Sequence, residues 1–479
     1  MVDLNLWHSL FASAILLISL SIFTTRSRRR HQKYPPGPRR LPLIGNLLNM
    51  PSKDGWVTYK KWSDQSGSDV VHVDVMGSHI VILNSGKAAN ELLEKRSAIY
   101  SDSMGLDFSH GTLPYGDRWR RLRRAFHAHF NATTSKEYRP LEMKAVQRLL
   151  RNLFENPDKF SQHLRLMTGQ IILSIAYGLD VRTEDDPYVV AAERVVKAVS
   201  HVSSSPWFLL LDMMPWLIYM PSWFPGGSFL LEARKSHPIV LSTIETPHAE
   251  VKAALVTGTA TTSVTAKMIS QLHENSTEEE ILATKAIPGF TYLAGSDTTV
   301  SALRTFFLAM TLYPQVQRKA QAEIDSVTGG SRLPDFSDMA SFPYVDAVIK
   351  EVLRWHPVTP LGVPHRVMED DVYEGHFIPA GSVIIPNVRG IIHDCVLFPE
   401  PDRFHPERWL VPDPPPSPEI VFGYGRRICQ GRFMVRDTIW ATIVNVLATF
   451  DISPVEDNPP KELYSSGLVS FVLSSLVIA

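Results

Sequence analysis

Cysteine is scarce in this chain: only Cys395 and Cys429 occur among 479 residues. Two cysteines cannot build a disulfide framework, and there is no C-x-x-C pair for zinc binding or thiol exchange. One bridge between the two remains open as an alternative, but a reducing compartment is the more economical interpretation. The cysteine content therefore excludes a disulfide-stapled scaffold, and each thiol has to be explained by its own surroundings.

The chain also has almost no net charge, because 48 Lys and Arg side chains nearly balance 49 Asp and Glu side chains. A chain without a basic excess gives no reason to expect a nucleic-acid partner. Proline is frequent, with 35 residues, but it is spread along the chain, which predicts turns in a folded protein and no single disordered tract. No internal repeat or long linker follows residue 50. These features favour one large folded domain.

A long apolar run lies near the N-terminus, at residues 6–23, and it has about the length that a membrane-spanning helix needs. Basic residues follow this run but do not precede it: Arg26, Arg28, Arg29, Arg30 and Lys33. A cleaved secretory peptide carries its positive charges first. The charge order therefore predicts an uncleaved transmembrane anchor at residues 1–25, with the rest of the chain in the cytoplasm. A cleaved signal peptide and a buried core helix are the alternatives.

Residues 26–49 form a basic and proline-rich hinge. Three prolines in this segment, at 35, 36 and 38, fix the backbone and remove hydrogen-bond donors, so we expect a stiff, extended spacer. An ordinary proline-rich linker would look the same. The main domain then covers residues 50–479.

Apolar residues at helical spacing dominate this domain. They predict helices at 115–132, 139–155, 160–178, 188–203, 279–313, 314–328, 342–355 and 432–450. Shorter β-rich pieces predict strands at 69–75, 79–83, 377–385 and 466–477. The fold class is thus mostly α with a minor β part (α+β). Pro288 falls inside the long helix at 279–313, where we expect a kink or the start of a new segment.

One cysteine stands in an unusual setting, the stretch FGYGRRICQG at 422–431. Its glycines allow tight turns and close approach of the backbone, and Arg426 and Arg427 can bind carboxylates through forked donors. These cations and the start of the following helix should lower the pKa of the Cys429 thiol. Such a thiolate suits a soft metal on a group that carries carboxylates, as haem does. A nucleophilic cysteine and an inert buried cysteine remain the rivals.

The spacing of the stretch resembles the haem-binding loop of the cytochrome P-450 (haem-thiolate monooxygenase) superfamily, F-x-x-G-x-R-x-C-x-G. The matching residues are Phe422, Gly425, Arg427, Cys429 and Gly431. The resemblance implies haem b as the cofactor and Cys429 as the axial ligand of its iron, which favours cleavage of the O–O bond. It also implies that Phe422 packs near the sulfur and that Arg427 meets a haem propionate.

Residues 294–299, AGSDTT, resemble the oxygen-binding motif of the same family. Ala294 and Gly295 have little side-chain volume, so a diatomic ligand could fit against the helix. Asp297 and Thr298 can relay protons from solvent to bound dioxygen. In the alternative interpretation Thr298 only bonds back to the carbonyl four residues earlier.

Three further motifs fit the resemblance. EVLR at 351–354 and the P-E-R segment of FHPERW at 404–409 imply a buried structural lock of Glu351, Arg354 and Arg408 behind the haem. WRRLR at 119–123 implies that Trp119 and Arg123 bind propionates, although a plain basic helix face is the alternative. His365 stands where many members place another propionate contact. The neighbouring arginines, Arg118, Arg120, Arg121 and Arg124, suit the docking of an acidic electron donor.

The resemblance covers nearly the whole chain and points to fungal microsomal oxidases of secondary metabolites or xenobiotics. It implies insertion of one oxygen atom of O2 into a lipophilic substrate such as a terpenoid, a polyketide or an aromatic compound. Electrons would come from NADPH through a membrane-bound reductase, with cytochrome b5 as an optional donor, at the endoplasmic reticulum membrane. A haem-thiolate isomerase or dehydratase that uses no O2 is an alternative, but such relatives tend to lose the helix threonine.

Three features depart from the pattern of the family: Pro288 lies inside the predicted central helix, Arg389 stands where relatives usually carry Trp, and the C-terminus is unusually apolar. The C-terminal stretch 465–479 is almost entirely apolar, so we expect a buried strand or an altered C-terminus. The second case would favour a haem-binding protein without catalytic turnover. Asn131 and Asn275 match the glycosylation pattern, and we expect both to be chance matches in a cytosolic domain.

Overall fold

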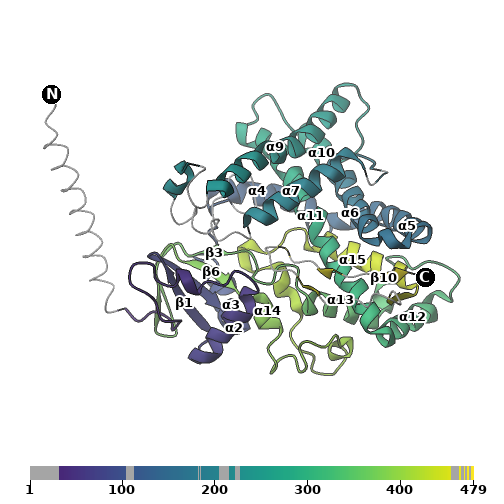
Figure 1. Cartoon of the computed structure of the whole chain (residues 1–479). Coiled ribbons are helices and arrows are strands. Elements are labelled where there is room, and N and C mark those ends of the chain that lie inside the picture. The colour runs from purple at the N-terminus through teal and green to yellow at the C-terminus, as the bar shows by residue number, and fades with distance from the viewer. Residues whose placement is uncertain are drawn as a thin grey trace.

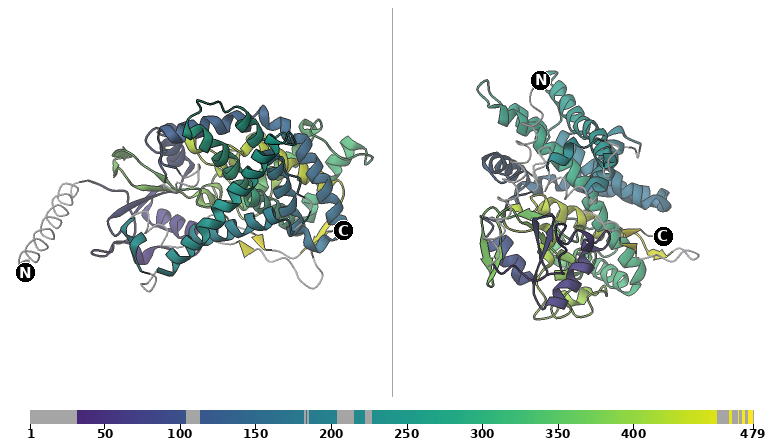
Figure 2. Two further views of the ribbon diagram at one scale, coloured as in Figure 1. Left: turned by 90° about the horizontal axis from the view of Figure 1, so that it is seen from above. Right: turned by 60° about the vertical axis from the view of Figure 1, so that its left-hand side comes forward.

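The structure, a computed structural model, describes most of the chain. The described residues are 32–103, 113–181, 183, 185–203, 215–221, 227–454, 463–464, 469, 472–473 and 476–478. A small sheet lies at one end of the molecule, and helices make up most of the rest (Figures 1 and 2). The fold class is therefore as predicted, mostly α with a minor β part.

The longer helices agree closely with the predicted ones. They are α4 (Asp117–Phe130), α5 (Arg139–Glu155), α6 (Phe160–Tyr177), α7 (Pro187–Ser203), α11 (Glu278–Leu312), α12 (Pro314–Thr328), α13 (Pro343–Trp355) and α15 (Arg432–Leu447). The apolar spacing did not predict α2 (Gly55–Ser66), α3 (Gly86–Ala89), α9 (Gly227–Val256), α10 (Val264–Ser270) or α14 (Val388–Ile392). The missed helix α9 is long, but Pro238 and Pro247 lie inside it and interrupt the pattern.

Helix α11 runs through the middle of the helical part and packs against α4, α6, α7, α9 and α15 (Figure 1). It begins with a capping box: the Thr277 hydroxyl accepts from the Glu280 N–H at 3.3 Å, and the Glu280 carboxylate accepts from the Thr277 N–H at 2.8 Å. The helix continues past Pro288 to Leu312. The expectation that a new segment starts at Pro288 is therefore wrong.

Close packing of two helices explains why the residue after Pro288 is a glycine. A Cβ atom on Gly289 would lie 2.6 Å from a side-chain carbon of Ile244 on α9, a distance that real Cβ contacts do not reach. Gly289 therefore lets α9 and α11 approach each other. Beyond this point α11 is largely buried, and Phe306 and Phe307 in its C-terminal half have no exposed surface.

The sheet has four strands in the order β1–β2–β6–β3. Strand β1 (Val70–Val75) pairs antiparallel with β2 (Ser78–Leu83), β2 pairs parallel with β6 (Val383–Pro386), and β6 pairs antiparallel with β3 (His365–Arg366). The predicted strand at 377–385 is in fact two strands, β5 (His376–Ile378) and β6, because Gly381 turns the chain with a φ of 81°. Strand β5 pairs with β4 (Asp371–Tyr373) in a separate hairpin.

The apolar C-terminal stretch forms strands where the structure describes it. Strand β10 (Leu476–Ile478) pairs antiparallel with β7 (Ile452–Pro454), and β9 (Val472–Leu473) pairs with β8 (Leu463–Tyr464). The predicted strand at 466–477 is thus confirmed for β9 and the start of β10, and its other residues lie outside the described ones apart from Val469.

The proline-rich hinge lies on the sheet. The Phe377 N–H donates to the Lys33 carbonyl at 2.7 Å, and the His72 N–H donates to the Pro36 carbonyl at 2.9 Å. The Tyr34 ring stacks on the rings of His72 and His79, with centroids 5.0 and 5.3 Å apart. The hinge from Lys33 onward is therefore an extended segment that is docked on the sheet by hydrogen bonds and ring stacking.

No helix in the part of the chain that the structure describes is long and apolar enough to cross a membrane. The predicted anchor at residues 1–25 lies outside that part.

The Asn131 side chain has a structural role that does not involve glycosylation. Its side-chain oxygen accepts from the N–H groups of Thr133 and Thr134 at 2.9 and 3.0 Å, and its amide donates to the His127 carbonyl at 3.0 Å. The side chain thus closes the end of α4.

We expect Glu142→Gln to remove a pH-dependent part of the folding free energy. Burial between α5 and α15 raises the pKa of Glu142 from 4.5 to about 8. A pKa raised in the folded state stabilises the fold fully below about pH 4.5, and this stabilisation is lost as the pH rises through about 8. Between about pH 5.5 and 8.5 the wild type should lose up to about 3 kcal/mol that the variant does not lose.

Urea titrations at the two pH values would measure this difference. Glu137→Gln is the control, since Glu137 is exposed and should leave the pH dependence of the wild type unchanged. An equal loss in the wild type and in Glu142→Gln would contradict the prediction.

Candidate active site

Two segments far apart in the sequence carry most of the predicted site: the middle of α11 and the loop that precedes α15. Helix α11 is buried at 287–289 and again from Thr299 onward, but residues 293–298 keep partial exposure. Such exposure in the middle of a buried helix indicates that these side chains face space that protein atoms do not fill. The AGSDTT motif lies in this stretch.

The loop at 422–431 is bent by two of its three glycines. Gly423 has a φ of 86° and Gly425 a φ of 48°, which side chains disfavour. A Cβ on Gly425 would also lie 2.5 Å from the Leu93 carbonyl oxygen, so the loop passes directly against η2 (Asn90–Lys95). Gly431 differs, because its φ of −78° is available to any residue.

Cys429 lies at the end of this loop, just before α15. Its N–H donates to the Phe422 carbonyl at 2.7 Å, which closes the loop. The thiol keeps exposed surface although it lies deep inside the protein. Both observations hold if the sulfur lines a hollow in the interior.

Burial decides the ionisation of this thiol. The backbone N–H groups of Gly431 and Arg432 and the charges of Arg123 and Arg432 all lower the pKa of Cys429, but burial raises it further, and the net shift is upward. The expectation that the cations and the start of the helix lower the pKa of this thiol overall is therefore wrong for the chain without a ligand. A metal ion would have to displace the proton.

Helix α4 and the loop place two partly buried guanidinium groups near Cys429. Arg123 donates to the Ile428 carbonyl at 2.7 Å, and Arg427 donates to the Ser101 and Leu113 carbonyls at 2.8 and 2.6 Å. Both lie over the ring of Trp119, with the guanidinium carbons 5.5 and 4.6 Å from its centroid. Burial lowers the pKa of each arginine to about 10.

These groups can bind an anion. Among the described residues, no carboxylate lies within ion-pair distance of Arg123, and the indole N–H of the buried Trp119 has no hydrogen-bond acceptor. A buried cation is costly unless it is paired. The site is therefore suited to a ligand that brings negative charge, such as a carboxylate.

His365 on β3 fits this role less well. Its Nδ1 lies 2.8 Å from the Tyr100 carbonyl oxygen, and since a carbonyl only accepts, the proton of a neutral ring must be on Nδ1. Burial, assisted by the charge of Arg427, lowers the pKa of His365 to about 4. Its Nε2 is then an acceptor, and it could bind a propionate only after gaining a proton.

On α11 the structure separates the two residues of the predicted proton relay. The Thr298 hydroxyl donates to the Ala294 carbonyl at 2.8 Å, as Thr291 and Thr311 do to the carbonyls four residues earlier. Asp297 lies instead toward Arg165 on α6, with 3.9 Å between Nε and Oδ1. The back-bonded geometry of Thr298 is thus common in this helix and does not by itself indicate catalysis.

Gly295 serves helix packing. A Cβ there would lie 2.6 Å from a side-chain carbon of Ile172 on α6, so the missing side chain lets α6 and α11 approach. The small volume was also expected to make room for a diatomic ligand, and for Gly295 this stays a prediction. Ala294 is partly exposed, as the prediction requires.

The structure brings Glu351, Arg354 and Arg408 together. Arg354 donates to both Glu351 oxygens at 2.9 Å, and Arg408 Nε donates to Oε1 at 3.1 Å. The side chains of Glu351 and Arg354 are 0% exposed. Two partners of Glu351 were not predicted, the His405 N–H at 2.9 Å and the Trp409 indole N–H at 3.1 Å. Both lie in the FHPERW stretch, but no sequence pattern marks them as donors.

Comparisons with known proteins agree with this geometry. Residues 35–476 match the family model described as Cytochrome P450. The chain is 40% identical to the cytochrome P450 monooxygenase ple1 of Rhodocybe pseudopiperita over 93% of its own length and 88% of that protein. It is 41% identical to the cytochrome P450 monooxygenase COX2 of Coprinopsis cinerea, over 91% and 86% of the two chains. A third relative, eriA of Hericium erinaceus, is 41% identical over 90% and 84%.

The cofactor that these matches imply is haem b, and the residues present fit it. The site offers one enclosed thiol and two partly buried guanidinium groups that both lie near the indole of Trp119. A soft sulfur ligand suits haem iron, and the two cations with the indole suit the two propionates.

Gly425→Ala should destabilise the protein far more than Gly431→Ala. The first change forces a side chain into the left-handed region and against the Leu93 carbonyl, which we expect to cost about 2–4 kcal/mol. At Gly431 the φ is ordinary, and a Cβ would lie 4.0 Å from the Cys429 sulfur. Urea unfolding of both variants measures the difference, and equal losses would show that the loop does not have this backbone.

Glu351→Gln should cost about 3–5 kcal/mol, since it leaves Arg354 and Arg408 buried with unpaired charge. Glu400→Gln is the matched control, because Glu400 pairs with Arg403 at 3.3 Å on the surface. It should change the free energy of unfolding by less than about 0.5 kcal/mol. If both changes have the same small effect, the buried cluster is not a structural lock.

Proposed function

Because the chain belongs to the cytochrome P450 family, whose curated relatives are fungal monooxygenases, we propose that it inserts one oxygen atom of O2 into a lipophilic organic substrate. The second oxygen atom would leave as water. The observation that carries this proposal is the Cys429 thiol, which is enclosed yet accessible, at the end of a loop with the haem-binding spacing.

In this proposal each side chain of the site has one task. Cys429 loses its proton and holds the iron, and the N–H groups at the start of α15 together with Arg123 offset the negative charge of the sulfur. Arg123, Arg427 and Trp119 bind the propionates, which supply a negatively charged partner for the Arg123 guanidinium. When bound, haem b supplies the iron at which O2 is reduced.

Thr298 and Asp297 would move protons on the side of the site that α11 forms. The Thr298 hydroxyl can accept a proton through a lone pair and release its own, which in this structure is donated in a hydrogen bond to the Ala294 carbonyl. Asp297 carries the carboxyl nearest to Thr298 in the sequence, and it would supply the next proton to the Thr298 hydroxyl. Glu351, Arg354 and Arg408 act only on the fold, by holding the segment before the Cys429 loop.

Electrons would come from NADPH through a cytochrome P-450 reductase, with cytochrome b5 as an optional second donor. The exposed arginines of α4, Arg118, Arg120, Arg121 and Arg124, lie on the same helix as Trp119 and Arg123 and suit an acidic partner. Arg121 already pairs with Glu279 at 2.5 Å, so Arg124 is the more available cation.

The membrane assignment stays a proposal that rests on the sequence. Residues 1–25 would anchor the chain in the endoplasmic reticulum membrane, residues 26–49 would be the hinge, and residues 50–479 the cytosolic catalytic domain. The docked position of Tyr34 and Pro36 on the sheet supports a fixed geometry between anchor and domain. A terpenoid, polyketide or aromatic substrate in secondary metabolism fits the kinship with fungal relatives.

Reconstitution with NADPH, a reductase and a panel of lipophilic compounds tests the proposal. With 18O2, we expect one labelled oxygen in the product. Thr298→Ala should divert NADPH electrons to peroxide and lower the share that reaches product by about tenfold or more.

Thr305→Ala is the matched control, because Thr305 lies two turns further on α11, is buried and bonds back to Ser301 in the same way. It should leave the product share unchanged. Oxygen derived from water, or equal coupling in both threonine variants, would contradict the proposed reaction or the proposed role of Thr298.

A further inference from the structure

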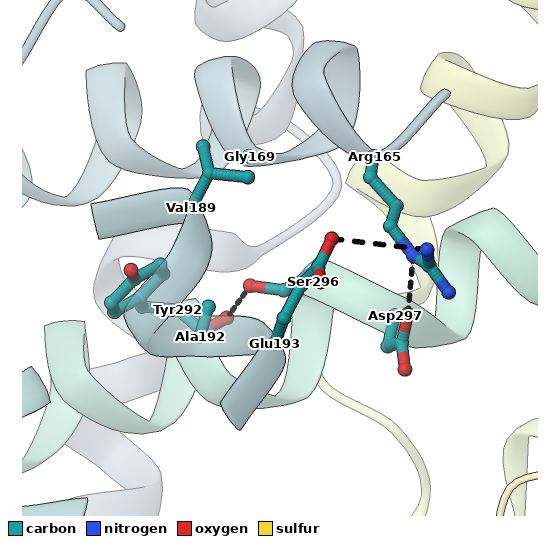
Figure 3. Close-up of a pocket in the computed structure, with 8 residues that line it drawn as sticks. All are labelled: Arg165, Gly169, Val189, Ala192, Glu193, Tyr292, Ser296 and Asp297. Atoms are coloured by element: carbon teal, nitrogen blue, oxygen red, sulfur yellow. Dashed lines mark hydrogen bonds and ion pairs between the residues drawn. The ribbon is translucent and has the colours of Figure 1, made fainter. Parts of the chain in front are cut away.

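A small cavity lies beside Asp297, between α11 and the helices α6 and α7 (Figure 3). Its volume is about 20 Å³, and its polar lining includes Arg165 of α6, Glu193 of α7, and Ser296 and Asp297 of α11. A cavity needs roughly 10–15 Å³ and two to four polar partners to hold one water molecule. This cavity meets both conditions for a single water.

The contacts across the cavity are too long to be direct hydrogen bonds. Arg165 Nε lies 3.9 Å from Asp297 Oδ1, and Arg165 Nη1 lies 3.8 Å from Glu193 Oε1. Figure 3 marks both ion pairs with dashed lines. Arg165 Nε is buried, and within the part of the chain that the structure describes it has no hydrogen-bond partner. A buried donor at this distance from a carboxylate is normally bridged by water.

The exposed fraction of the side chain decreases from Glu193 through Arg165 to Asp297. Glu193 is 33% exposed, Arg165 27% and Asp297 15%. Glu193 can therefore exchange protons with bulk water, while Asp297 reaches solvent less easily. Figure 3 shows the three side chains converging on one region, each from a different helix.

The charges around Asp297 come from all three helices. Arg165 on α6 and Arg304 on α11 are the cations, and Glu193 on α7 is the second anion. Burial and the charge of Arg165 lower the pKa of Arg304, whereas the charge of Asp297 raises it. Ser296 is neutral, donates to the Tyr292 carbonyl and accepts from Thr168 through its own carbonyl.

We propose that Glu193 and a single water in this cavity form the proton route to Asp297, and that Arg165 is the positioning residue that holds the two carboxylates on either side of that water. This inference rests on the proposed role of Asp297 and Thr298. Glu193 takes a proton from bulk water and gives it to the cavity water, which releases one of its own to Asp297. Asp297 passes a proton to Thr298. Each group of the route thus gains one proton and gives one up, and no group is oxidised or reduced.

Four variants of the haem-loaded, full-length protein test the route. Glu193→Gln removes the proton carrier, Arg165→Met removes the positioning cation, and Arg165→Lys should restore part of its effect. Ala192→Val narrows the cavity without changing any charge, since Ala192 lines it and is buried. Glu155→Gln is the control, because Glu155 is exposed at the end of α5.

We expect Glu193→Gln and Ala192→Val to slow coupled turnover by about three- to tenfold, to increase the solvent isotope effect and to raise the peroxide share. Glu193→Gln should also flatten the pH dependence of turnover, which a merely structural change would not do. If both variants couple as the wild type while Thr298→Ala does not, this route is wrong and the proposed function stands.

A second measurement does not depend on turnover. A double-mutant cycle of Arg165→Met and Asp297→Asn in urea unfolding should give a midpoint shift smaller than the sum of the two single shifts, because each change removes the same water-bridged pair. Additive shifts would overturn the role of Arg165. If no compound of the panel is oxidised, the proposed function fails, and this cycle still decides whether Arg165 and Asp297 interact.

Discussion

The burial of Glu351 constrains more of this structure than any other single interaction. Its carboxylate has no exposed surface and accepts five hydrogen bonds, from Arg354, Arg408, Trp409 and the backbone of His405. A carboxylate buried so deeply is tolerated only when it is fully paired. The segment that carries these donors must therefore stay against α13, and it leads directly into the loop of Cys429. The position of the thiol thus depends on a charge cluster that takes no part in the chemistry.

A second constraint acts on α11, which has to be both a core helix and a wall of the site. Two glycines allow α11 to pack closely in the core. Without a Cβ atom, Gly289 lets Ile244 of α9 lie against the helix, and Gly295 does the same for Ile172 of α6. The second demand leaves residues 293–298 partly exposed and puts the charge of Asp297 inside the protein. The Arg123 guanidinium on α4 is partly buried without a carboxylate partner among the described residues, and an anionic ligand would balance its charge.

The sequence predicted those features that depend on local periodicity and on spacing. Eight helices follow from apolar patterns, and the i, i+3 spacing of Glu351 and Arg354 predicts their contact. It failed where a tertiary contact overrides a local rule: α11 continues past Pro288, and α9 contains Pro238 and Pro247. The ionisation of Cys429 was wrongly predicted because its neighbours in sequence are cations, whereas the larger effect is burial by distant segments. Arg165 and Glu193 belong to no motif, and only the packing of α6 and α7 on α11 brings them to Asp297.

The central claim is that the loop at 422–431 presents Cys429 as a thiolate ligand to haem iron. The absorption spectrum of the reduced, carbon-monoxide-bound protein tests this claim most directly. A variant of each cysteine is measured, and the Cys395 variant is the control for the Cys429 variant. Cys395→Ser should keep a strongly red-shifted Soret band, as in the wild type, because Cys395 lies in an exposed loop. Cys429→Ser should lose that band. A Soret band at the ordinary position in the wild type, or a red-shifted band that survives in Cys429→Ser, would contradict the account.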